Sequence, residues 1–105
     1  IYYQGHGLKK NPARARTHFM DAAKLGSPIG QFMTALMLQN GEGHPGDKSE
    51  PLKAFIWGMV SKMNGYADAD SVLEYSKMQL SRSVQTKATK LAQICFESEY
   101  DRCPT

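Results

Sequence analysis

Apolar residues recur every three or four positions along most of this chain, which is the spacing of one buried face of an α-helix. After Pro12, for example, apolar residues recur with this spacing at Ala15, Phe19, Ala22 and Ala23. The pattern predicts helices over residues 11–26, 28–41, 49–65 and 67–79, and from 81 onward. No stretch alternates apolar and polar residues with a period of two, so the sequence predicts an all-α fold without a sheet.

The residues at the ends of these segments are typical of helix termini. Asn11-Pro12 is an N-cap followed by proline at the first helical position, where the missing N–H costs nothing. Pro28 and Pro51 open two further helices, and Ser81 is the expected N-cap of the last one. Three glycines follow helical segments as stop signals: Gly26, Gly41 and Gly65.

The chain contains an internal repeat. Gly5-His6-Gly7 recurs 36 residues later as Gly41-Glu42-Gly43, and a three-residue insertion within 44–47 then increases the shift to 39. With that shift the aligned pairs are Ala15 with Ala54, His18 with Trp57, Gly26 with Gly65, and Gly30 with Ala69. Each copy is a helix–turn–helix unit that cannot bury its apolar face alone, so we expect the units to stack.

These residues resemble the Sel-1-like repeat, a relative of the tetratricopeptide repeat. The first copy matches the family pattern at Gly5-His6-Gly7-Leu8, Asn11, Arg14-Ala15, His18-Phe19, Ala22-Ala23, Gly26 and Gly30-Gln31. The second copy keeps Lys53-Ala54 and Trp57, but it has Ser61-Lys62 where the family has two alanines. The third copy lacks the Gly-x-Gly turn, which is typical of a repeat that forms a C-terminal cap.

The resemblance implies an α/α superhelical solenoid of about two and a half helix–turn–helix repeats with a C-terminal capping helix. The expected units are approximately 1–27, 28–66 and 67–105, and together they form a single domain, 1–105. The chain begins at Ile1, and its first five residues are typical of the last turn of a helix followed by a glycine stop. We therefore expect this sequence to be a fragment of a longer protein.

The amino-acid composition and the net charge indicate which kinds of partner are not expected. The 105 residues are 41% hydrophobic and 22% charged, which is the balance of a folded protein rather than a disordered one. The longest apolar run is far too short to span a bilayer, so membrane insertion is not expected. The net charge of +3 permits acidic partners, but no recognition-helix, zinc-finger or RNA-binding motif accompanies it, so nucleic acid is not an expected partner.

The family resemblance implies a non-enzymatic scaffold that binds a protein or peptide on a concave face. In such folds the first helix of each pair lines that face, and the residues at the matching positions are Phe32, Leu36, Gln39, Ser71, Tyr75 and Met78. A surface of this composition accepts an apolar peptide anchor. The alternative is that most of these side chains belong to the core between the helices.

Motifs for other chemistry are missing from the sequence. It has no Ser-x-x-Lys, His-Glu-x-x-His, Cys-x-x-Cys or Gly-x-Ser-x-Gly, and no phosphate loop. We expect no enzyme activity and no cofactor. His6 and His44 lie in equivalent turns, so a metal shared between them is one interpretation, but exposed turn histidines explain them better. The alternative function is a ligand-binding or enzyme-associated module acting on cell-wall or β-lactam-like molecules.

The two cysteines bear on the cellular compartment. In the repeat register Cys95 takes the position of Ala22 and Ser61, and Cys103 takes that of Gly30 and Ala69. The chain is similar to the secreted, cysteine-rich bacterial members of the family, whose repeats carry bridges at comparable positions. That similarity implies a Cys95–Cys103 disulfide and a periplasmic or secreted protein. Two buried thiols in a cytoplasmic adaptor remain the alternative.

Overall fold

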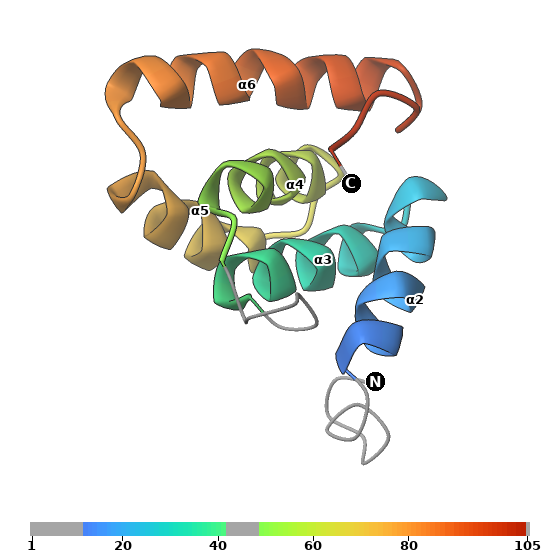
Figure 1. The fold of residues 1–105 in the computed structure, drawn as a ribbon. Coiled ribbons are helices and arrows are strands. Elements are labelled where there is room, and N and C mark those ends of the chain that lie inside the picture. Colours follow the sequence, from blue (N-terminus) through green and yellow to red (C-terminus); the bar gives the residue numbers. More distant parts are fainter. Residues whose placement is uncertain (1–11, 42–48, 105) are drawn as a thin grey trace.

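The computed structural model describes residues 12–41 and 49–104, and this part of the chain is all-helical (Figure 1). The helices are α2 (Pro12–Lys24), α3 (Pro28–Asn40), α4 (Pro51–Met63), α5 (Ala69–Met78) and α6 (Arg82–Glu97). Each lies within a segment that the hydrophobic periodicity predicts, and no strand occurs among the described residues, so the all-α prediction is confirmed. The turns at Gly5–Gly7 and His44, and the helical turn expected before Gly5, lie outside the described residues.

Local capping explains where the helices begin and end. The Ser27 hydroxyl accepts a hydrogen bond from the Gly30 N–H at 3.0 Å, which caps α3 ahead of Pro28. Gly41 ends α3 in the left-handed conformation, with φ at 76°, and its N–H donates to the Met37 carbonyl. Ser81 caps α6 in the same way as Ser27 caps α3, at 3.3 Å from the Val84 N–H. The predicted stop at Gly41 and the predicted cap at Ser81 are confirmed.

Helix α4 lies at the centre of the molecule and packs against α3, α5 and α6 (Figure 1). Helix α2 packs on α3, and α6 crosses over α4 with little direct contact with α5. The core joins Trp57 and Val60 of α4 to the stripe of Ala88, Ala92 and Cys95 on α6, all fully buried. The result is one compact body of 38 × 26 × 22 Å.

Small residues stand where helices approach one another. A Cβ at Gly30 would lie 2.8 Å from the Ala22 Cβ, so α2 and α3 can pack at this distance only because residue 30 is glycine. Ala15, Ala54 and Ala88, which the repeat register makes equivalent, are all buried. Another aligned pair differs, since His18 is exposed whereas Trp57 is completely buried.

No helix in the described part of the chain is both long enough and apolar enough to cross a bilayer.

Candidate functional site

The expected disulfide is present: Cys95 near the end of α6 is bonded to Cys103, with their Cα atoms 4.6 Å apart. Between them the chain reverses direction, and both Glu99 (φ 54°) and Tyr100 (φ 69°) adopt the left-handed conformation that is uncommon for residues other than glycine. We call residues 98–104 the C-terminal strap. The disulfide closes the strap back onto the helix from which it emerges.

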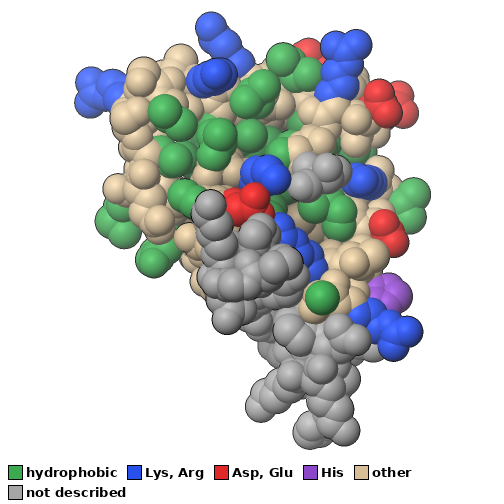
Figure 2. Space-filling view, in the orientation of Figure 1, with side chains coloured by type: hydrophobic (Ala, Val, Ile, Leu, Met, Phe, Trp, Pro, Cys, Tyr) green, Lys and Arg blue, Asp and Glu red, His purple; other side chains and the backbone are tan. Residues whose placement is uncertain are grey.

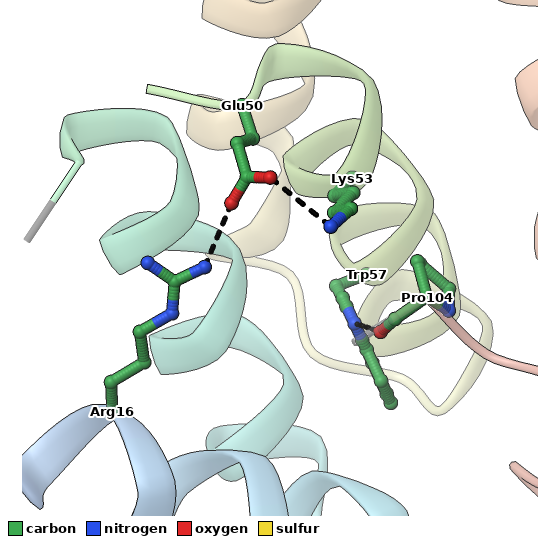
Figure 3. A network of polar contacts seen from close by, with 5 residues as sticks. All are labelled: Arg16, Glu50, Lys53, Trp57 and Pro104. Atoms are coloured by element: carbon green, nitrogen blue, oxygen red, sulfur yellow. Dashed lines mark hydrogen bonds and ion pairs between the residues drawn. The ribbon is translucent and has the colours of Figure 1, made fainter. Parts of the chain in front are cut away.

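The strap also contacts the other helices. The Trp57 indole Nε1–H donates to the Pro104 carbonyl at 2.8 Å (Figure 3). The Tyr100 hydroxyl accepts from Asn64 Nδ2 at 3.0 Å, and the same amide nitrogen reaches Gln31 Oε1 at 2.9 Å. The Tyr100 ring covers Gly26, where an added Cβ would lie 3.2 Å from the ring edge. The strap therefore connects α6 to α4 and to the α2–α3 turn.

A second polar network joins α2 to the start of α4 (Figure 3). Arg16 Nη2 lies 2.8 Å from Glu50 Oε2, and Lys53 Nζ lies 3.1 Å from Glu50 Oε1. Burial by itself raises the pKa of the Glu50 carboxyl, but the hydrogen bonds and positive charges of Arg16 and Lys53 outweigh that effect and hold the pKa below its ordinary value. These residues bond to one another and position α2 relative to α4.

The α5 half of the predicted binding face is exposed. Tyr75 is 49% and Met78 is 79% exposed, and the exposed Ser71 lies on the same side of the helix. The Ser71 hydroxyl donates to the Asp68 carbonyl at 2.9 Å. The opposite side of α5, which carries Val72 and Ser76, is buried. The structure therefore leaves two large apolar side chains on the outer side of α5.

The α3 half of that face differs. Phe32 and Leu36 are half-buried and pack against the core, and the Phe32 ring lies 5.1 Å from the Tyr66 ring. Gln39 is half-buried, and its Oε1 atom is buried without a hydrogen-bond partner in the described part of the chain. For Phe32 and Leu36, the alternative that they belong to the packing between helices agrees with their burial.

A groove that the sequence analysis did not anticipate lies among α4, α5 and α6. It has a volume of about 400 Å³, and its apolar lining comes from Phe55, Met59 and Leu73. We call it the α5–α6 groove. On the face shown in Figure 2, hydrophobic side chains gather over α4 and the lower side of α6, and lysine and arginine side chains stand along the edge formed by α6. None of the six residues predicted for the concave face lines this groove.

The described residues contain no group of three or more histidine, cysteine, aspartate or glutamate side chains placed to hold a metal ion. His6 and His44, the pair considered for a shared metal, lie outside the described residues.

Comparison of the chain with protein-family models, with curated proteins and with solved structures finds no match.

Proposed function

We propose that this chain is a non-enzymatic scaffold of the Sel-1-like type that binds a protein or peptide outside the cytoplasm. The observation that carries the proposal is the pair of exposed apolar side chains, Tyr75 and Met78, on the outer side of α5. A tyrosine and a methionine one turn apart are common anchors in protein interfaces, because they bury a large area and tolerate varied partners.

The pattern of helix contacts supports a stack of helix pairs. Two pairs of helices that are two apart in the chain contact each other: α3 packs on α5, and α4 packs on α6. Successive pairs of a helical solenoid make this kind of contact. In the proposed stack α3 and α5 are the first helices of their units, and Phe32, Leu36, Gln39, Ser71, Tyr75 and Met78 belong to one concave face.

The disulfide supports a location outside the cytoplasm. Reducing conditions in the cytoplasm of most organisms keep structural thiols unpaired, whereas disulfides persist in the periplasm and in secreted proteins. The Cys95–Cys103 bridge pairs both cysteines of the chain. The proposed location is therefore the bacterial envelope or the extracellular space.

The binding face is tested with Tyr75→Ser and Met78→Ser in the oxidised chain. A partner is first isolated from native extract on the immobilised chain and identified, and its affinity for each variant is then measured. Each substitution removes an apolar anchor, so we expect the affinity to fall by about tenfold or more. Leu91→Ser, which removes an exposed apolar side chain on α6, is the matched control.

Unchanged affinity in both variants, with circular dichroism showing that they are folded, would exclude this face as the binding site.

A further inference from the structure

The α5–α6 groove exists because α6 lies across α4 and makes little contact with α5. Its walls come from α5 and α6, and its apolar lining comes from Met59, Leu73 and Phe55. A volume of about 400 Å³ is at the lower end of the range for ligand pockets. The groove therefore has room for a short segment of peptide with one apolar side chain.

Charge is distributed unevenly along the groove. At one end Lys62 and Asp70 form an ion pair at 2.7 Å, so these two charges balance each other. At the other end lie Lys77 and Arg82, and in the described part of the chain neither is within ion-pair distance of a carboxylate. Glu74 lies one helical turn before Lys77 and offsets one of these two positive charges. One positive charge therefore remains in excess at this end.

The α6 wall offers hydrogen-bond acceptors. The hydroxyls of Thr86 and Thr89 donate to carbonyls of their own helix at 3.1 and 2.9 Å, which leaves the oxygen lone pairs as acceptors. Gln85 Nε2 donates to the Lys77 and Leu80 carbonyls at 3.1 and 2.9 Å, so its amide oxygen is the remaining acceptor. The backbone N–H groups of a bound peptide are donors that fit these three acceptors.

We propose that the α5–α6 groove binds a peptide segment in which an apolar side chain stands next to an acidic one. The apolar side chain lies on Met59 and Leu73, the carboxylate meets Arg82 and Lys77, and the peptide N–H groups donate to the α6 wall. This proposal rests on the interaction role proposed above, but it concerns a different surface and specifies the chemistry of the partner.

The test is a titration of the ¹⁵N-labelled, oxidised chain with acetyl-Ala-Leu-Asp-Ala-amide, followed by two-dimensional NMR. Blocked termini ensure that the side chain supplies the only carboxylate. We expect saturable shifts at Met59, Leu73, Arg82 and Thr86, with a dissociation constant of about 1 mM for so short a peptide. Replacing Asp by Lys in the peptide is expected to weaken binding about tenfold.

Arg82→Glu is the diagnostic variant, and Arg102→Glu is its matched control. Both change the net charge equally, both residues are exposed, and Arg102 does not line this groove. Arg82 is the first residue of α6, where a glutamate favours the helix, so the variant is expected to fold. We expect Arg82→Glu to weaken binding about tenfold and Arg102→Glu to change it less than about twofold.

Three results would overturn the proposal: no saturation, equal binding of the lysine peptide, or equal loss in the two arginine variants. The third result would mean that the peptide responds only to overall charge. Tyr75→Ser leaves the groove lining intact, so this peptide is expected to bind that variant normally. A result that disproves peptide binding in the groove is therefore distinguishable from one that disproves partner binding on the α5 face.

Discussion

Single polar residues connect helices that are distant in the chain. Ser61, which departs from the alanine of the Sel-1-like pattern, is fully buried, and its hydroxyl donates to the Pro28 carbonyl at 2.8 Å. This hydrogen bond gives the buried serine hydroxyl a partner and joins α4 to the first turn of α3. Glu50 has a comparable role between α2 and α4, through Arg16 and Lys53.

Glu50→Gln is expected to lower the free energy of unfolding at pH 7 by about 0.5–1 kcal/mol, because it removes a half-buried ion pair. The pKa of Glu50 is depressed in the folded state, so its contribution to stability is present above the ordinary pKa of an unfolded glutamate and is lost as the pH falls through the lower pKa of the folded state. Urea unfolding of the oxidised proteins at pH 7 and at about pH 3 measures the difference.

Glu74→Gln is the control for this experiment, since Glu74 is exposed and forms no ion pair in the described part of the chain. Its effect is expected to stay within about 0.5 kcal/mol. A Glu50→Gln effect of the same size at both pH values would contradict the electrostatic explanation.

At the scale of the helices, the distance between two packed helices depends on where their contacting residues are small. At Gly30 the neighbouring atoms are the Ala22 Cβ and the backbone of α2, at 2.8–3.1 Å from an added Cβ. At Gly58 they are the ends of the Leu73 and Val72 side chains, at 3.2–3.5 Å. Backbone cannot move without shifting a whole helix, whereas a side-chain end can rotate away.

Gly30→Ala is therefore expected to destabilise the protein by about 1–3 kcal/mol, because α2 and α3 must separate. This figure is the net loss that remains after the gain of about 1 kcal/mol that alanine brings to a helix. Gly58→Ala makes the same chemical change inside α4, and there we expect the two effects nearly to cancel. Urea unfolding of both oxidised variants checks the contrast, and equal losses would show that crowding against α2 is not the cause.

At the scale of the whole molecule, the C-terminal strap joins parts of the chain that are far apart in sequence. It is bonded to α6 through Cys103, to Trp57 of α4 through Pro104, and to Asn64 through Tyr100. The left-handed backbone at Glu99 and Tyr100 costs conformational energy that these contacts must offset. Opening the disulfide removes the one covalent restraint among them.

Reduction of the disulfide is expected to lower the free energy of unfolding by about 2–3 kcal/mol, from the loss of loop closure. Trp57 is the only tryptophan of the chain and is completely buried beneath the strap, so its fluorescence emission in the native state is expected to shift to longer wavelength. Thiol titration should find no reactive thiol before reduction and two afterwards, under denaturing conditions.

The variant Cys95→Ser with Cys103→Ser should reproduce the changes in stability and fluorescence without a reductant. Unchanged Trp57 emission in a folded, reduced protein would mean that packing alone holds the strap. Two reactive thiols in protein recovered from its native source would contradict both the disulfide and the proposed location.

The sequence by itself determined the helices, because spacing and capping act over a few residues. Pro28, Ser81 and Gly41 begin or end helices as predicted, and the register of the cysteines, together with the family resemblance, identified their pairing. Only the tertiary structure decided which helical faces are covered. It buried much of Leu36 and left Tyr75 exposed, although these two residues occupy matching positions in the repeat.

The α5–α6 groove and the strap contacts likewise became visible only in three dimensions. The groove depends on where α6 crosses α4, and the strap depends on where the last residues meet Trp57 and Gly26. Both arrangements follow from the summed packing of side chains contributed by several helices. The spacing along one helix carries no information about that packing, which is why the sequence predicts the helices whereas only the folded chain shows the groove and the strap contacts.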